Sequence, residues 1–371
     1  MNLTNPVNSY EPNVSEKTFH VFYLVIITLA IIIGNSTVLL VIRLDHRLHS
    51  PTFYFLGNLA VADILVGVGY VPFYIISVLN QAWVLGLALC RAHTFVVSTS
   101  FNASIMTLCV VSVDRFLDIS DPLRYYGRMT QKKTKILIAF IWLHSIFWAS
   151  CPLWNWGETL FDVTTHTCRP NFAPIETPGK VYGILLAIFG FAIPVIVTIY
   201  SYFRMFRVAE DQSKKIAKDF SMSHSASRNT EDTGKRTNPR PARDKKAHKT
   251  ILIIIGAFFF CWLPYTFGTS WKILTGQTLA PYWLANLGLT LALTNSFINP
   301  IVYTIRDRRF RRGLQKTLCS RRNPWENGIH SRNESQSNIA LAQRVDQTLS
   351  TKTAVQNDAR QENSMIETRY Y

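Results

Sequence analysis

The chain has 371 residues, of which 48% are hydrophobic and only 17% are charged. This composition is too apolar for an ordinary soluble enzyme of such length. The formal net charge is +16, from 39 basic and 23 acidic side chains. Because the basic residues gather beside the apolar segments, the excess charge indicates contact with anionic lipid headgroups rather than with nucleic acid.

Seven apolar segments follow one another along the chain, each long enough or nearly long enough to cross a hydrocarbon core of about 30 Å as a helix. One such segment could be a buried helix of a soluble protein. Seven in series predict an all-α membrane protein with a seven-transmembrane helix bundle. A seven-span transporter is the alternative, but no inverted repeat is evident. The segments are 19–41, 51–79, 87–113, 135–154, 181–202, 250–263 and 281–303.

The distribution of Lys and Arg predicts the orientation, because such residues beside spanning segments are retained in the cytoplasm. They are dense after the first, third, fifth and seventh segments and sparse in the other connections. We therefore expect an extracellular segment over 1–19, a membrane domain over 20–319 and a cytoplasmic tail over 320–371. The polar tail and the middle of the third cytoplasmic connection, about 213–241, are predicted to be disordered. Since the first 17 residues are polar, we expect no cleaved signal peptide.

Several residues are candidates for covalent modification. Cys90 and Cys168 both fall at the expected outer surface, where oxidising conditions favour a disulfide between them. Asn2 and Asn13 begin glycosylation sequons in the expected extracellular segment. Cys319 follows a short basic amphipathic helix after the last span, where palmitoylation is expected.

Polar side chains within the apolar segments are costly in lipid and are therefore candidates for function. Asp63 lies in the middle of the second segment, and neutral oxygens lie at similar depth in other segments. A carboxylate among neutral oxygens suits a sodium ion, although a hydrogen-bond cluster that joins helices without an ion is the alternative. The expected sodium ligands are Asp63, Ser104, Asn295, Ser296 and Asn299. Prolines 72, 152, 194, 264 and 300 are expected to kink their helices.

Over about 20–319 the chain resembles a rhodopsin-like (class A) G-protein-coupled receptor. The resemblance rests on motifs whose order, spacing and side of the membrane agree. They are Gly34-Asn35, Leu59-Ala60-Val61-Ala62-Asp63, Asp114-Arg115-Phe116, Trp142, Pro194, Tyr202, Cys261-Trp262-Leu263-Pro264 and Asn299-Pro300-Ile301-Val302-Tyr303. The resemblance implies a multi-pass plasma-membrane receptor that transmits the binding of an extracellular ligand to a heterotrimeric G protein. It also implies regulation by a kinase and arrestin, and no enzymatic activity. A receptor that binds its ligand without signalling is the alternative.

The resemblance also implies roles for individual residues. Arg115 is expected to be restrained by Asp114 and Asp244 and, on release, to contact the Gα subunit. Trp262 is expected to couple ligand contact to the kink at Pro264. The residues assigned to coupling and activation are Asp114, Arg115, Phe116, Tyr202, Asp244, Trp262, Pro264, Asn299, Pro300 and Tyr303. Phe116 departs from the tyrosine usual in the family.

The ligand is not identified by these motifs. The chain is nearest in pattern to the biogenic-amine receptors, but their third-span aspartate falls on Val97. The lysine that carries retinal in opsins falls on Leu293, so no retinal is expected. The expected pocket wall suits a small, neutral or weakly polar ligand, although Glu158, Asp162 and Glu176 in the second outer connection would attract a cation. That wall consists of Val97, Ser98, Phe101, Tyr265, Thr266, Thr269 and Leu293.

Overall fold

The computed structural model describes residues 13–163, 165–171, 177–226, 256–271 and 282–320. Within the chain two compact units are distinguished, 1–313 and 314–371. All packing contacts reported below lie within the first unit. Of the sequence predictions, those for Asn2, Glu176 and Asp244 fall outside the described residues.

The first helix, α1 (Val14–Leu44), begins at a capping box. The Asn13 side chain accepts a hydrogen bond from the Glu16 backbone N–H at 2.9 Å, and the Glu16 carboxylate accepts one from the Asn13 N–H at 3.2 Å. This arrangement satisfies N–H groups that a helix start otherwise leaves unpaired. The helix thus begins six residues before residue 20, where the membrane domain is expected to start.

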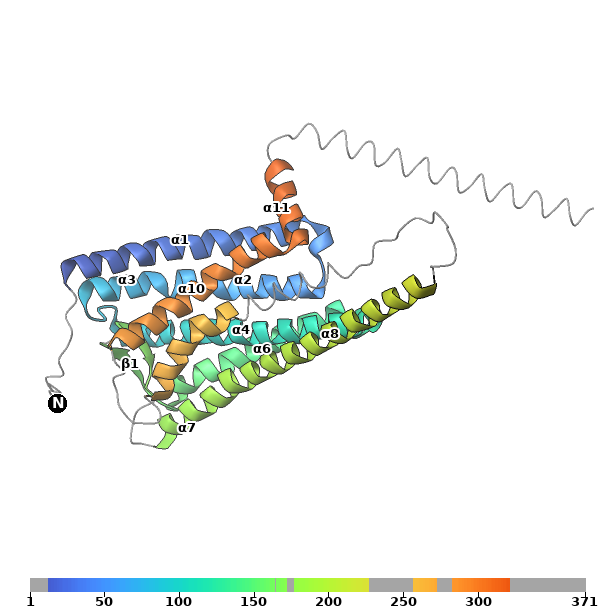
Figure 1. Cartoon of the computed structure of the whole chain (residues 1–371). Coiled ribbons are helices and arrows are strands. Elements are labelled where there is room, and N and C mark those ends of the chain that lie inside the picture. Colours follow the sequence, from blue (N-terminus) through green and yellow to red (C-terminus); the bar gives the residue numbers. More distant parts are fainter. Residues whose placement is uncertain (1–12, 164, 172–176, 227–255, 272–281, 321–371) are drawn as a thin grey trace, which may run out of the picture. The chain divides into compact units, whose positions relative to one another are not determined.

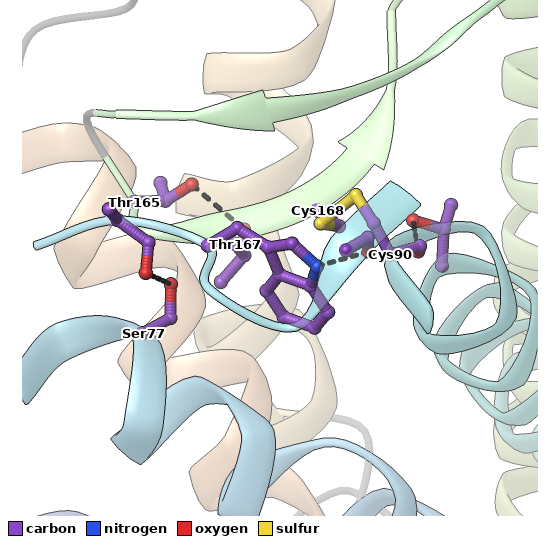
Figure 2. The surroundings of a disulfide bond; sticks show 9 residues. Ser77, Cys90, Thr165, Thr167 and Cys168 are labelled. Atoms are coloured by element: carbon purple, nitrogen blue, oxygen red, sulfur yellow. Dashed lines mark hydrogen bonds between the residues drawn. A yellow bond between two sulfur atoms is a disulfide. The ribbon is translucent and has the colours of Figure 1, made fainter. Parts of the chain in front are cut away.

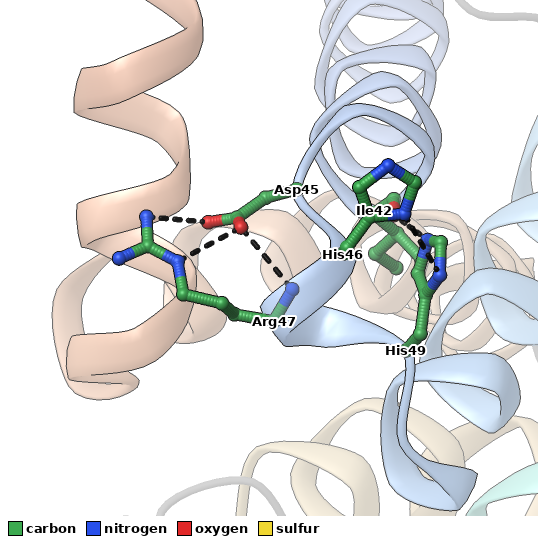
Figure 3. Close-up of polar contacts among 5 residues, drawn as sticks. All are labelled: Ile42, Asp45, His46, Arg47 and His49. Atoms are coloured by element: carbon green, nitrogen blue, oxygen red, sulfur yellow. Dashed lines mark hydrogen bonds and ion pairs between the residues drawn. The ribbon is translucent and has the colours of Figure 1, made fainter. Parts of the chain in front are cut away.

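A tight turn joins α1 to the next helix (Figure 3). The Asp45 carboxylate accepts hydrogen bonds from the Arg47 backbone and guanidinium at 3.0 to 3.2 Å, at the start of the short helix η1 (His46–Leu48). The His49 ring nitrogen Nε2 lies 3.0 Å from the Ile42 carbonyl oxygen. These contacts close the connection within a few residues, so that α2 runs back beside α1.

Three of the spanning segments change their helical form near a proline, as the sequence predicts. The second is divided into α2 (Pro51–Gly69) and α3 (Val71–Asn80) just before Pro72. The fourth passes from α6 (Gln131–Ser150) to the 3₁₀ helix η2 (Cys151–Trp154), which contains Pro152. The fifth comprises α7 (Thr177–Leu185), the π-helix η3 (Leu186–Ala192) and α8 (Ile193–Ala226), whose second residue is Pro194. Because proline lacks an N–H, the helix adjusts its hydrogen bonds at these points.

The third spanning helix, α4 (Gly86–Ser120), is the most buried of the five long apolar helices among the described residues, and it contacts α2, α6 and α8 (Figure 1). The short helix α5 (Pro122–Arg128) follows it. Residues 256–271 are helical, and α10 (Tyr282–Arg306) packs against α1. That contact is close because Gly34 has no side chain: a Cβ atom there would lie 3.2 Å from the Pro300 ring.

Five helices among the described residues are long and apolar enough to cross a membrane. They are Val14–Leu44, Pro51–Asn80, Gly86–Ser120, Gln131–Trp154 and Pro178–Val208. The segment 256–271 and α10 stand at the sixth and seventh predicted spans. The amphipathic helix expected after the last span is α11 (Arg308–Ser320). The fold class is therefore confirmed.

Two features differ from the sequence predictions. An antiparallel hairpin, β1 (Thr159–Asp162) and β2 (Thr167–Pro170), lies in the connection between η2 and α7. The predicted disorder from residue 213 is wrong as far as Ala226, because α8 continues to that residue. Lys, Ala and Met favour helix there, and Glu210 and Lys214 form an ion pair one turn apart at 2.8 Å. The rest of that prediction, 227–241, and the tail from 321 lie outside the described residues.

Candidate functional site

A disulfide joins α4 to the hairpin at one end of the bundle, which we call the hairpin end (Figure 2). Cys90 lies in the second turn of α4 and Cys168 in β2, and their Cα atoms are 5.5 Å apart. Both side chains are buried. The predicted pairing is confirmed, and it fixes the hairpin beside the start of α4.

The two strands of the hairpin are joined by an ion pair. Asp162 of β1 forms an ion pair with Arg169 of β2 and is 5% exposed. The expectation that Asp162 attracts a cationic ligand is therefore not supported, because its carboxylate already has a cationic partner. Glu158 is exposed just before the hairpin.

The residues of the predicted pocket wall differ in their ring contacts and in their burial. Phe101 on α4 meets the Trp262 ring edge to face, with centroids 5.1 Å apart, and Trp262 meets Tyr265 at 5.9 Å. Leu293 on α10 is fully buried, whereas Val97, Ser98 and Thr269 are half-buried. The Thr266 hydroxyl donates to the Trp262 carbonyl at 3.0 Å, so it is used within its own helix.

Trp262 has the surroundings expected of a packing switch. It is 3% exposed and lies between Phe101 and Phe258, whose ring centroid is 6.1 Å away. Pro264 follows two residues later in the same helical segment. The indole N–H of Trp262 is buried and has no hydrogen-bond partner among the described residues. Within the described part of the chain the ring is therefore held by packing, including its contacts with Phe101 and Phe258.

The predicted sodium ligands form a buried polar cluster around Asp63. The Asn299 amide donates to one Asp63 oxygen at 2.9 Å, and Ser296 also lies beside the carboxyl group. The second Asp63 oxygen and the Ser104 hydroxyl are buried without a hydrogen-bond partner in the described part of the chain. Asn295 is buried as well. Asn35, which was not among the expected ligands, joins the cluster to α1 by donating to the Ser296 carbonyl at 3.1 Å.

At the opposite end of the bundle, which we call the Arg115 end, the partners of Asp114 and Arg115 differ from those predicted. Asp114 is fully buried and accepts two hydrogen bonds of 2.6 Å, from the Thr52 and Tyr125 hydroxyls. Arg115 is paired with Asp118 instead, at 3.8 Å. Asp114 therefore forms its hydrogen bonds with the Thr52 and Tyr125 hydroxyls, while Arg115 lies near enough to interact with its charge without an ion pair between them.

Two tyrosines predicted to support activation lie near Arg115. Tyr202 on α8 is half-buried and close enough to Arg115 to interact with its charge. Tyr303 on α10 is 5% exposed, and its hydroxyl has no hydrogen-bond partner among the described residues. Phe116 is half-buried. The structure therefore brings Arg115, Tyr202 and Tyr303 to one region of the bundle.

The modification sites are only partly described. Asn13 is exposed at the cap of α1, and its side-chain oxygen, rather than its nitrogen, makes the capping bond. Cys319 lies in the last turn of α11, but its side chain is outside the described residues.

Sequence reasoning missed three residues. Thr52 and Tyr125 bind Asp114, and His93 on α4 is 3% exposed with both ring nitrogens unpartnered among the described residues. A histidine at the expected outer end of an apolar segment was the available signal for His93. Thr52 and Tyr125 gave no such signal, because hydroxyls are common in helices.

Comparisons with known proteins agree with this arrangement. The family model described as 7 transmembrane receptor (rhodopsin family) matches residues 34–303. The chain is 31% identical to the alpha-1A adrenergic receptor of Oryzias latipes, over 81% of this chain and 67% of that receptor. It is 32% identical to the human histamine H2 receptor, over 80% of this chain and 78% of that receptor. The crystal structure of squid rhodopsin is similar in fold, with a TM-score of 0.72 at 21% identity, covering 85% of this chain and 89% of that one.

Proposed function

This chain belongs to the rhodopsin family of seven-transmembrane receptors, and from that premise we propose that Arg115 is the residue through which it controls a G protein. The chain is a G-protein-coupled receptor and a multi-pass protein of the plasma membrane. We further propose that its N-terminus is extracellular, that the hairpin end receives a small ligand, and that the receptor is itself not an enzyme.

The position of Arg115 carries the proposal. Its side chain is 27% exposed, and its partner Asp118 is 39% exposed at 3.8 Å. An exposed pair of this kind contributes little stability, so the guanidinium can exchange Asp118 for an acceptor on a partner protein. Tyr202 and Tyr303 lie close by. Two tyrosine hydroxyls beside a guanidinium can support the orientation it takes when a Gα helix binds.

Ligand and G protein would then bias one equilibrium between two conformations. Each must raise the affinity of the other by the same factor, as linkage requires. The packed rings of Phe101 and Trp262 give a route from the hairpin end towards the interior, because movement of one ring displaces the other. A kinase and arrestin are proposed as regulators of the same receptor.

The test compares wild type with Arg115→Ala in cells by measuring ligand-free dissociation of each Gα family at matched surface levels. Arg124→Ala is the matched control, because Arg124 is an exposed cation at the same end that pairs with Asp121 at 3.8 Å. We expect a basal signal in wild type and in the control and its loss in Arg115→Ala. An equal signal in all three proteins would exclude the proposed role of Arg115.

We also propose that the Asp63 cluster binds sodium. The support is the pair of buried oxygens, one of Asp63 and the Ser104 hydroxyl, that have no hydrogen-bond partner among the described residues. An uncompensated buried carboxylate oxygen is costly, and a small cation would offset that cost. Asp63 would supply the charge, while Ser104 and Asn295 would add neutral oxygens.

The sodium proposal is tested by thermal unfolding of the purified receptor in NaCl and in KCl of equal ionic strength. We expect a higher unfolding midpoint in NaCl for wild type and for Asp118→Asn, which removes an exposed carboxylate. Asp63→Asn should remove the difference between the salts. A wild-type midpoint that is the same in both salts would refute sodium binding.

The proposed ligand is neither a monoamine nor retinal. Val97 stands where biogenic-amine receptors carry the aspartate that pairs with the ligand ammonium, and Leu293 stands at the retinal lysine of opsins. A buried ammonium without a carboxylate partner would be strongly disfavoured.

A further inference from the structure

His93 is a buried titratable side chain that the proposed function does not use. It is 3% exposed, and neither ring nitrogen has a hydrogen-bond partner among the described residues. The Tyr70 backbone is the polar group beside it, but it does not reach hydrogen-bonding geometry. A neutral imidazole offers one N–H donor and one acceptor nitrogen. Since buried polar groups are nearly always paired, an imidazole without any partner points to a missing one.

Aromatic rings hold His93 in place. Its ring stacks on Tyr70 with centroids 5.1 Å apart, and Trp83 and Phe73 lie at 5.2 and 6.0 Å. The Trp83 N–H donates to the Gly86 carbonyl, so it is not available to a ligand. The Tyr70 hydroxyl is also buried without a hydrogen-bond partner in the described part of the chain. The Thr167 side chain lies beside that hydroxyl, but Thr167 forms its hydrogen bond with Thr165 at 2.9 Å. His93 and Tyr70 therefore bring two polar groups without a hydrogen bond among the described residues into one aromatic setting, which we call the contact point.

The contact point is aligned with the expected pocket. His93, Val97 and Phe101 are spaced by four residues, so they lie along one face of α4. At about 1.5 Å per residue, His93 and Phe101 are separated by about 12 Å along the helix axis. Val97 between them is apolar, and Phe101 contacts Trp262. A ligand that spans this face would have a polar group at His93 and an apolar body of about that length.

The charges at the hairpin end favour an acidic polar group. Asp162 is paired with Arg169, the Glu16 carboxylate is bonded to the Asn13 backbone, and Glu158 is exposed just before the hairpin rather than buried beside His93. Cationic or protonatable side chains are more numerous there. The Lys17 ammonium donates to the Leu79 carbonyl, the His20 and Tyr74 side chains are 3.3 Å apart, and the His166 and Gln81 side chains are 2.8 Å apart. A ligand ammonium would lack a carboxylate partner among these residues, whereas a carboxylate could accept from His93 and Tyr70.

We propose that His93 anchors the carboxylate of an amphipathic acid whose apolar chain extends along Val97 to Phe101. The inference rests on the proposed function, because it names the class of ligand received at the hairpin end. His93 donates through one ring N–H and Tyr70 through its hydroxyl. The acid then contacts Phe101, which lies against Trp262, so occupancy is transmitted to the packing switch.

The experiment uses decanoate, whose extended chain matches this length, together with decanol and decylamine, which differ from it only in the polar group. The full-length receptor is placed in phosphatidylcholine nanodiscs, and its thermal unfolding midpoint is measured against the concentration of each compound. Three proteins are compared: wild type, His93→Phe, which keeps a ring but removes the nitrogens, and His93→Gln, which restores a donor.

We expect decanoate to raise the wild-type midpoint and decylamine to have no such effect. In His93→Phe the concentration needed should rise about tenfold to hundredfold, as expected for loss of a hydrogen bond to a charged group. His93→Gln should recover part of the loss. The proposal is overturned if decanoate has no effect, if wild type and His93→Phe respond equally, which would indicate a lipid effect only, or if decylamine is more effective than decanoate.

Adding Arg115→Ala to the experiment distinguishes failure of the acid site from failure of the proposed function. Arg115→Ala should keep the decanoate-dependent shift while losing G-protein dissociation. Absence of the shift in a wild type that still couples would refute the acid site alone. A His93-dependent shift in a wild type that does not couple would refute the coupling role and leave the acid site standing.

Discussion

The two hydroxyls that bind Asp114 should contribute measurably to stability. Tyr125 donates to one carboxylate oxygen and Thr52 to the other, each at 2.6 Å, and Asp114 is fully buried. Burial and then the bond to Asp114 raise the pKa of Tyr125, so its hydroxyl remains protonated and able to donate. Hydrogen bonds to a charged group contribute about 1.5–3 kcal/mol. Tyr125→Phe removes one of them with little change in volume.

The expected result is a fall of about 3–8 °C in the thermal unfolding midpoint, from the usual relation between stability and midpoint. Tyr54→Phe is the control, because Tyr54 is a half-buried tyrosine whose ring stacks on His49 with centroids 6.1 Å apart, a contact that phenylalanine keeps. Thr52→Val and the double variant complete a double-mutant cycle, which should be non-additive because both hydroxyls serve one carboxylate. If Tyr125→Phe and Tyr54→Phe both stay within about 1 °C of wild type, the reasoning from these two bonds is refuted.

Two further results follow from packing and charge. Gly288→Ala should lower the midpoint by about 2–6 °C, because a Cβ atom there would lie 2.8 Å from the Tyr265 backbone. Gly127→Ala, with nothing within 4 Å of the added atom, should leave it nearly unchanged in the same thermal assay. Burial lowers the pKa of His166, which lies at the hairpin beside Gln81. Since the folded protein binds this proton less readily than the unfolded chain, stability should fall as pH drops below about 6.5, and His166→Gln should reduce that fall in midpoints measured from pH 7.5 to pH 5.

The positions of the helices could be predicted because long apolar segments have few alternatives in a membrane. The changes of helical form near Pro72, Pro152 and Pro194 were also predictable, since proline removes a backbone donor wherever it stands. The hairpin was not predicted, because its four-residue strands show no distinct alternation. The continuation of α8 to Ala226 was missed because a polar helix has no apolar period to reveal it.

The sequence indicated which residues belong to the site, but it did not predict all of the contacts among them. The motifs placed Asp63 with Asn299 and Cys90 with Cys168 correctly. They gave no means of knowing that Thr52, 62 positions from Asp114 in the chain, would bind it. Such pairing depends on the rotation and height of each helix relative to its neighbours. Those quantities are set by the packing of the whole bundle rather than by any local pattern.

The pairing at the Arg115 end has a consequence for signalling. Asp114 is held by two hydroxyls and interacts with Arg115 only through its charge, and the ion pair of Arg115 is a partly exposed contact with Asp118 at 3.8 Å. Because such a contact is worth little, Asp118→Asn should change ligand-free G-protein dissociation by less than about twofold. The second expected restraint, Asp244, lies outside the described residues. If Asp244→Asn raises the basal signal strongly while Asp118→Asn does not, that residue is the main restraint. If Asp118→Asn alone raises the basal signal strongly, the contact with Asp118 is the main restraint on Arg115, and the argument from its exposure is wrong.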